Sequence, residues 1–167
     1  FGDAMISPQA MQRCAGEGRE VTFLDFAGRF RCRVVGPTHG NVLLRAAQHD
    51  AQRHPDRALP IARRFVAAKI RNSRQVLLRG ARDSKSDKDR QELAGVASDL
   101  AASLGRIEQA YAIDEVRGIE GEAAAGYFGV FGRLLTVPPA EFSFTLRTRR
   151  PPRDRVNALL SFLYALL

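Results

Sequence analysis

The chain of 167 residues contains no tryptophan, only two cysteines and no long hydrophobic run. Cys14 and Cys32 are too few for a disulfide framework and lack the paired spacing of a zinc site, so we predict two core thiols in a reducing compartment. A membrane-spanning helix needs about 20 consecutive apolar residues. Neither such a run nor a secretory segment is visible, which predicts a cytoplasmic protein with no membrane partner.

Acidic residues are outnumbered by basic ones, and unevenly along the chain. The sequence has 26 Lys and Arg against 18 Asp and Glu, a formal net charge of +8. Residues 61–90 contain ten basic and three acidic residues, whereas residues 91–140 contain three and seven. A positive charge concentrated in one segment indicates a polyanionic partner, first of all nucleic acid, and a merely solvated basic surface is the alternative.

The first part of the chain predicts a short helix followed by a β-hairpin. Ser7 is a suitable N-cap and Pro8 a suitable first residue for the helix. The segments EVTFLDF and RFRCRVV are typical of strands, with a turn at 27–28 between them. In the second segment arginines alternate with apolar residues, which predicts a half-buried hairpin. Its arginine row either solvates the sheet or contacts DNA or a partner.

Helical periodicity dominates the rest of the chain, which places the sequence in the α+β class. We expect a partial N-terminal β domain at 1–46, a connecting helix and linker at 47–58, and a partial C-terminal α-helical domain at 59–167. The chain begins at Phe1 rather than Met and stops inside the apolar pattern NALLSFLYALL without a capping residue. We therefore expect a fragment that is open at both ends and truncated within the helical domain.

The chain is predicted to be helical from residue 59 onwards, and its basic segment 61–82 carries two kinds of polar side chain. Its apolar face comprises Ala62, Phe65, Val66, Ile70, Val76 and Leu77, and the opposite face carries Arg64, Arg71, Arg74 and Arg82. The arginine stripe is a candidate for contacts with phosphates. Lys69, Asn72 and Arg79 project within or beside the apolar face. Because burying such groups without partners is costly, they either pair internally or line a cleft.

Two glutamates lie two residues apart in RGIEGEAAAGYF, residues 117–128. At about 100° per residue, Glu120 lies in the middle of an apolar stripe and Glu122 lies about 160° away, on the solvated side. An inward carboxylate has to be protonated, ion-paired or bound to a metal. The pattern supports an ion pair with Lys69 or Arg79 as well as it supports a metal ligand. Gly118, Gly121 and Gly126 surround Glu120, although glycine lowers helix propensity. The usual reason for such glycines is the close approach of another helix or of a ligand.

Four segments together resemble one known family over essentially the whole chain. They are GNVLLRAAQ (40–48), IARRFVAAKIRNSRQVLLR (61–79), RGIEGEAAAGYF (117–128) and RRPPRDRVNALLSFLYALL (149–167). In this order and spacing they are similar to the CRISPR-associated integrase of spacer acquisition, Cas protein one, and to its type I-C subgroup. The resemblance implies a β domain that mediates homodimerisation, followed by a helical domain that carries the active site.

The resemblance also implies a site and a reaction. Glu120 matches the glutamate of the family's GIEG motif, which makes it a catalytic residue and a ligand of Mg²⁺ or Mn²⁺. Two further ligands, a His in a motif like GFLH and an Asp beyond it, would lie downstream of the NALLSF helix. The implied reaction is metal-dependent phosphoryl transfer, in which a prespacer 3′-hydroxyl attacks a phosphodiester of the repeat. We expect the chain alone to be inactive, because one carboxylate holds such a cation weakly.

The resemblance assigns DNA-binding or supporting roles to further residues. The family's KI-N-R positions match Lys69, Asn72 and Arg79, and two residues of the last helix, Asn157 and Tyr164, would face the same cleft. Arg149, Arg150 and Arg153 flank two prolines and are expected to contact the backbone of double-stranded prespacer and repeat DNA. Tyr164 is equally well explained as a core aromatic residue. The implied protein partner is a small second Cas protein.

Two other functions remain open at the level of sequence. A non-catalytic basic helical module could bind DNA or act as a scaffold, with Glu120 merely ion-paired to Lys69 or Arg79. An RNA-binding protein is a weaker alternative, because tryptophan is absent and the aromatic residues fall on apolar stripes rather than on a stacking platform.

Overall fold

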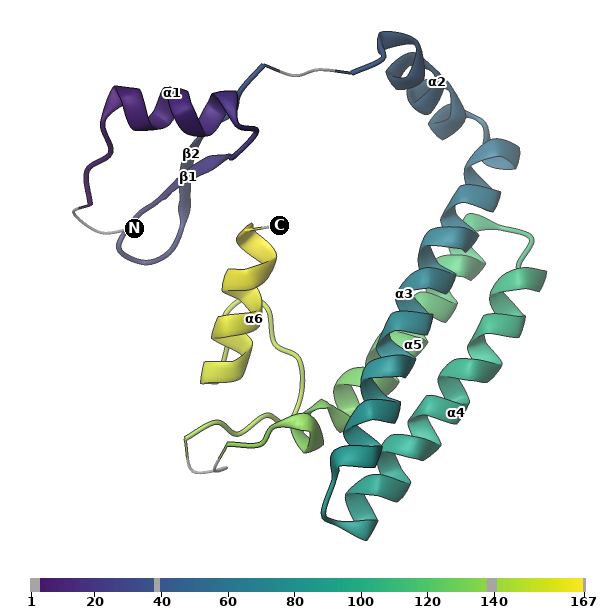
Figure 1. Ribbon diagram of the computed structural model, residues 1–167. Coiled ribbons are helices and arrows are strands. Elements are labelled where there is room, and N and C mark those ends of the chain that lie inside the picture. Colours follow the sequence, from purple (N-terminus) through teal and green to yellow (C-terminus); the bar gives the residue numbers. More distant parts are fainter. Residues whose placement is uncertain (1–3, 38–39, 138–140, 167) are drawn as a thin grey trace.

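The computed structural model describes residues 4–37, 40–137 and 141–166 (Figure 1). Its first part is a helix with a two-stranded antiparallel sheet, and the rest is mostly helical, so the predicted α+β class is confirmed. The N-terminal helix and hairpin stand apart from a bundle of three long helices (Figure 1).

Helix α1 (Pro8–Gly16) begins as its sequence predicts. The Ser7 hydroxyl accepts the backbone N–H of Ala10 at 3.2 Å, and proline occupies the first turn. Because an N-cap satisfies backbone donors that the helix itself leaves free, this start is fixed by local chemistry. The helix leads directly into the hairpin.

The hairpin turn between β1 (Val21–Leu24) and β2 (Phe30–Val34) is built on Asp25. The Asp25 carboxylate accepts the backbone N–H groups of Ala27 and Arg29 at 2.9 and 2.8 Å. The bond from Arg29 is the main cause that lowers the pKa of Asp25 below its ordinary value. An ionised carboxylate therefore holds the turn predicted at 27–28.

The hairpin is more exposed than its alternating sequence predicts. Phe30 is 57% exposed. Cys14 is half-buried and Cys32 is exposed, so the prediction of a half-buried β2 and of two core thiols is wrong. The ion pairs here join Arg31 to Asp25 at 3.1 Å and Arg33 to Glu20 at 2.8 Å. Two strands alone cannot bury an apolar face, and α1 has no buried residue to offer.

Gly36 brings the end of the hairpin against the backbone of α1. A Cβ at Gly36 would lie 2.2 Å from the carbonyl oxygen of Ala15, and a backbone atom cannot swing aside as a side chain can. We expect Gly36→Ala to cost about 1–3 kcal/mol and to speed hydrogen exchange of the α1 amides in the full chain. Gly16→Ala, whose new Cβ would meet nothing within 4 Å, is the matched control. Equal exchange in the two variants would contradict the close approach.

Helices α3 (Pro55–Asp83), α4 (Asp87–Gln109) and α5 (Ile113–Val130) pack as a three-helix bundle, and α2 (Val42–Arg53) leads into it (Figure 1). The largest fully buried apolar side chains of the bundle are Leu77, Leu93, Leu100, Ile107 and Val116. Two residues predicted on the apolar face of α3 are not buried: Phe65 is 73% and Val76 46% exposed. The buried side of α3 is centred on Ile70 and Leu77, and the flank beside it is uncovered at these two positions.

The chain leaves the bundle through a short 3-10 helix, η1 (Phe131–Leu134), and ends in α6 (Arg155–Leu166). Arg133 of η1 forms ion pairs with Asp89 and Glu92, which tie η1 to α4. Phe144 lies between η1 and α6 in sequence, and the centre of its ring lies 5.1 Å from the centre of the Phe131 ring. These contacts bring the segment before α6 back to the bundle.

The predicted limits between parts fall inside helices. Residues 46 and 47 both lie in α2, and residues 58 and 59 both lie in α3. The division into 1–46, 47–58 and 59–167 stays a prediction. Within the described ranges, no helix combines the length and the apolar character that crossing a bilayer requires.

Candidate functional site

Glu120 lies at the rim of the buried face of α5 rather than at its centre. The buried residues of this helix are Val116, Ile119, Ala123 and Val130, which lie to one side of Glu120 on the helical wheel. The side chain is 35% exposed and its carboxylate pairs with the ammonium of Lys69 on α3. The sequence left open an ion pair with Lys69 or Arg79 and a metal ligand, and the structure shows the ion pair with Lys69. Arg79 does not take this place, since its guanidinium faces Asp83 at 3.7 Å.

Glu122 has a different environment although it belongs to the same helix. It is exposed, as predicted, and pairs with Arg106 of α4 at 2.8 Å. The two glutamates thus offer a matched comparison: each pairs with a cation of a neighbouring helix, but only Glu120 lines the pocket described next.

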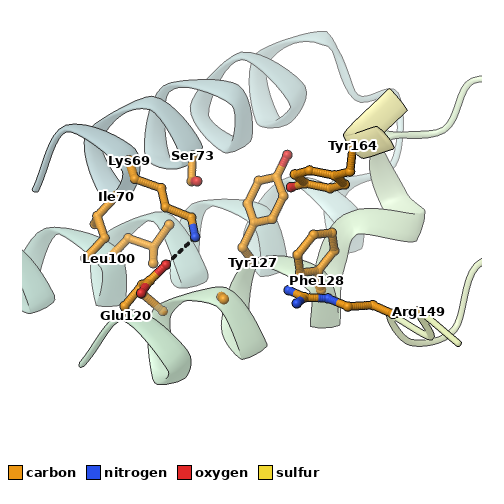
Figure 2. Close-up of a pocket in the computed structure, with 11 residues that line it drawn as sticks. Lys69, Ile70, Ser73, Leu100, Glu120, Tyr127, Phe128, Arg149 and Tyr164 are labelled. Atoms are coloured by element: carbon orange, nitrogen blue, oxygen red, sulfur yellow. Dashed lines mark hydrogen bonds and ion pairs between the residues drawn. The ribbon is translucent and has the colours of Figure 1, made fainter. Parts of the chain in front are cut away.

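A pocket opens beside Glu120 between α3, α5 and the C-terminal part of the chain (Figure 2). We call it the Glu120 pocket. Its lining is Lys69, Ile70, Ser73, Leu100, Glu120, Ala123, Ala124, Tyr127, Phe128, Arg149 and Tyr164. Glu120 is the single acidic side chain among these residues, and Lys69 and Arg149 are the cations. The pocket therefore combines one hard oxygen donor with positive charge that suits a phosphate.

Tyr127 and Tyr164 close the pocket on the side opposite Lys69 (Figure 2). Burial, and secondarily the neighbouring Tyr164, raises the pKa of Tyr127 above its ordinary value, so its phenol keeps its proton at neutral pH. Tyr127 was not among the site residues predicted from the sequence. The signal was present, because Tyr127 follows Glu120 by two helical turns and so shares its face.

Asn157 is completely buried and holds the segment before α6 against that helix. Its side-chain oxygen accepts the Arg147 guanidinium and the Thr148 backbone N–H, each at 2.9 Å. Its side-chain nitrogen donates to the Leu146 carbonyl at 2.9 Å and to Asp154. With all of its polar atoms engaged inside the protein, Asn157 does not line the cleft as expected but supports the residues that do.

Arg147 connects this buried network to a second, basic hollow. Its guanidinium donates to Ser161 at 3.3 Å and lies 5.7 Å from the centre of the Tyr164 ring, in cation–π contact. The basic hollow is lined by Lys69, Arg147, Arg149, Arg150, Ser161, Tyr164 and Ala165. No acidic residue belongs to this described lining. The basic hollow adjoins the Glu120 pocket, because Lys69, Arg149 and Tyr164 line both.

The sequence from residue 1 to residue 167 matches the family model described as CRISPR associated protein Cas1. The chain belongs to the Cas1 family. Curated relatives agree: it is 47% identical to CRISPR-associated endonuclease Cas1 1 of Moorella thermoacetica over 167 residues, and 44% identical to CRISPR-associated endonuclease Cas1 1 of Chlorobaculum tepidum. Each alignment covers all of this chain and 49% of the relative, so the chain spans about half the length of the curated Cas1 proteins it matches.

Solved structures share the fold. A Cas6-RT-Cas1–Cas2 complex superposes with a TM-score of 0.66 at 30% identity, over 96% of this chain and 17% of the other. A Cas1 protein from Thermotoga maritima gives a TM-score of 0.69 at 23% identity, over 96% and 48% of the two chains. A casposase bound to integration product gives 0.69 at 22% identity, over 96% and 43%.

The other cations predicted for a Cas1 nucleic-acid surface are dispersed. Arg64 and Arg71 are exposed on α3, where they line a groove with Glu108 of α4. Arg74 is half-buried and its Nε donates to the Ala97 carbonyl of α4 at 3.2 Å. Arg74 is thus engaged between two helices, which does not favour a phosphate contact.

Some of the remaining predicted residues line the basic hollow and others do not. Asn72 and Arg79 are exposed on α3 but line neither hollow. Arg149 and Arg150 line the basic hollow, and Arg153 is exposed nearby, with its backbone N–H donating to the Thr148 hydroxyl at 3.0 Å. The structure therefore brings together Glu120, Lys69 and the two adjacent arginines, and it leaves the DNA-binding roles of all these residues as predictions.

The described residues alone do not fit a divalent cation. In the part of the chain that the structure describes, no group of three or more His, Cys, Asp or Glu side chains lies close enough to hold a metal ion. Glu120 offers one carboxylate, and that carboxylate pairs with Lys69. Mg²⁺ and Mn²⁺ require several oxygen ligands, so a metal site here would need ligands from outside these residues.

Proposed function

We propose that this Cas1 chain belongs to a CRISPR adaptation integrase, a metal-dependent DNA endonuclease and strand-transfer enzyme that inserts prespacer DNA into the repeat array. The observation that carries the proposal is the position of Glu120 as the one acidic side chain in the described lining of a pocket that also holds Lys69 and Arg149. The names of the 47% and 44% identical relatives, both CRISPR-associated endonucleases, support the reaction class.

The partners and cofactor of this proposal follow from the same likeness. Mg²⁺ or Mn²⁺ would be the cofactor, with Glu120 as one ligand. The solved structure at 30% identity is a Cas6-RT-Cas1–Cas2 complex, which supports Cas2 as the small protein partner. We further propose that the substrates are double-stranded prespacer and repeat DNA. The protein would act in the cytoplasm as a Cas1 homodimer and would belong to the type I-C subgroup.

The residues of this chain have distinct tasks in the proposed reaction. Arg149 and Arg150, on the segment that Asn157 fixes to α6, would hold backbone phosphates beside the pocket. The neutral phenol of Tyr127 would donate a hydrogen bond to an oxygen of the bound phosphodiester rather than repel it. Such contacts are independent of base sequence, so they position DNA without selecting it.

The test is strand transfer by the full-length protein with its Cas2 partner on a repeat-containing plasmid. Removing divalent cations with a chelator is expected to lower product at least about 100-fold, because a metal ion contributes several kcal/mol to phosphoryl transfer. Readdition of Mg²⁺ or Mn²⁺ should restore it, whereas readdition of Na⁺ should not. Undiminished product in the chelator would contradict the proposal.

The second candidate is a non-catalytic DNA-binding or scaffolding module. The ion pair between Lys69 and Glu120 favours it, because a carboxylate that is already paired needs no metal to explain it. Under this function the full-length protein would bind DNA with strong salt dependence but would yield no strand-transfer product with any divalent cation.

A further inference from the structure

A groove follows α3 where this helix packs beside α4 (Figure 1). We call it the α3–α4 groove. Helix α3 lines it with the residues at positions 60, 63, 64, 67, 68 and 71, and α4 contributes Ile107 and Glu108. The α3 positions have the i, i+3, i+4, i+7 spacing of one helical face, so the groove runs for about three turns, or about 16 Å.

Two arginines of the α3–α4 groove have no anion among the described residues. Arg64 and Arg71 are exposed and lie two turns apart on the same face of α3. Neither forms an ion pair with a residue that the structure describes. Arg63 differs, because its guanidinium donates to the carbonyl oxygen of Ala110 and ties α3 to the end of α4. The groove therefore offers an external anion two guanidinium groups.

The rest of the lining favours a protein segment over a nucleic acid. Half of the described lining is apolar and comprises Pro60, Ala67, Ala68 and Ile107. A charged phosphate backbone gains little from such a surface, whereas the apolar face of a peptide helix is stabilised by burial against it. The short side chains of the two alanines allow a partner helix to approach closely. Glu108 repels a phosphate but accepts an N–H donor from a peptide.

The α3–α4 groove lies away from the site proposed for DNA. At about 100° per residue, Lys69 projects from α3 about 170° away from the middle of the groove. The Glu120 pocket and the basic hollow, both lined by Lys69, therefore lie on the opposite side of α3. DNA held in the basic hollow would have to bend around the bundle to reach Arg64 and Arg71, which leaves these two arginines to a different anion.

We propose that the α3–α4 groove docks an acidic amphipathic helix of a partner protein. Two carboxylates seven residues apart on that helix bind Arg64 and Arg71, because a guanidinium pairs with a carboxylate through parallel hydrogen bonds. Small apolar residues between the carboxylates pack on Ala67 and Ala68. The proposed function does not use this surface, so the docking and the strand-transfer reaction can fail independently.

The first test measures the fluorescence anisotropy of a labelled peptide that is titrated with the full-length protein. The peptide is an alanine-rich helix with leucine and two glutamates, seven residues apart, on one face, and the reference peptide has glutamine at both positions. The glutamate peptide is expected to bind about tenfold more tightly than the reference. The double variant Arg64→Gln, Arg71→Gln should reduce this preference to less than about twofold, because it removes both ion pairs.

Two further variants separate the groove from the general charge of α3. Ala68→Trp fills the groove and keeps its charges, so both peptides should bind at least about tenfold more weakly. Ala68→Leu serves if the tryptophan variant does not fold. Arg82→Gln is the matched control and should leave binding unchanged, because Arg82 is exposed on the same face of α3 but lies outside the lining of the groove.

The second test measures the affinity of the same variants for a DNA duplex as a function of salt. The slope of log affinity against log salt should be the same in the double variant Arg64→Gln, Arg71→Gln as in the unmodified protein. A slope reduced by about two would make both arginines phosphate ligands and would overturn the docking of a protein segment.

Two other results would also overturn the docking. The first is a glutamate peptide that binds no more tightly than the glutamine peptide, or that keeps its preference in the double variant. The second is a smaller oligomer of the double variant in light scattering, which would mean that a second copy of this chain occupies the groove.

Discussion

Replacing Glu120 by Gln in the full-length protein is expected to lower strand transfer at least about 100-fold, whereas Glu122→Gln should leave it within about threefold. Glutamine keeps the shape of the side chain but removes the negative charge and most of its capacity to bind a hard cation. Losing a ligand that helps to stabilise charge on the transferring phosphate costs several kcal/mol, and each 1.4 kcal/mol is about a factor of ten in rate.

The Glu120→Gln and Glu122→Gln variants are matched in the ion pairs that they lose. Glu120 pairs with Lys69 of α3 and Glu122 with Arg106 of α4, so each substitution removes one interhelical ion pair. Exposed ion pairs contribute about 0–1 kcal/mol to the free energy of unfolding, so both variants should fold. Thermal unfolding of each variant would verify this. Initial rates of product formation at saturating DNA then report the site alone. Retained activity in Glu120→Gln would favour the non-catalytic DNA-binding function.

The features that the sequence predicted correctly are those set by neighbouring residues. Ser7 caps α1, a turn follows Asp25, and Glu122 faces solvent, because caps, turns and helical periodicity depend only on residues a few positions apart. The inward tendency of Glu120 was also visible from periodicity. Its position at the rim rather than the centre was not, because the packing of three helices decides which part of a broad apolar face is buried.

The features that the sequence did not predict depend on which elements meet. Phe65 and Val76 share the apolar character of Ile70 but lie on a flank of α3 that is uncovered at these positions. Pattern alone also left open which cation would pair with Glu120. Lys69 does so because α3 and α5 pack at that level, whereas Arg79 is about three turns further along α3.

Asn157 shows the same limit in a polar residue. The resemblance predicted a residue that faces the cleft, and an isolated asparagine in a helix carries no signal of burial. In the structure it joins Leu146, Arg147 and Thr148 to α6, and through Arg147 it reaches Tyr164 in the basic hollow. The position of the segment that carries Arg149 and Arg150 therefore depends on one buried amide.

Asn157→Ala is accordingly expected to destabilise the segment before α6 by about 2–4 kcal/mol. The substitution leaves the Thr148 N–H, the Leu146 carbonyl and one bond of the Arg147 guanidinium without their partner, and an unsatisfied buried polar group costs about 1–3 kcal/mol. Alanine is the better helix former, so the change in α6 itself partly offsets this loss.

Hydrogen exchange and limited proteolysis of the full-length protein would localise the effect. Exchange at 146–154 should accelerate by a factor of about 30 or more, which corresponds to at least 2 kcal/mol, and tryptic cleavage after Arg147 or Arg149 should become faster. Asn72→Ala is the matched control, because its amide is exposed on α3 and its loss should change stability by less than about 0.5 kcal/mol. Equal protection of 146–154 in the two variants would mean that Asn157 does not hold the segment, and the arginines of the basic hollow would then owe their position to other contacts.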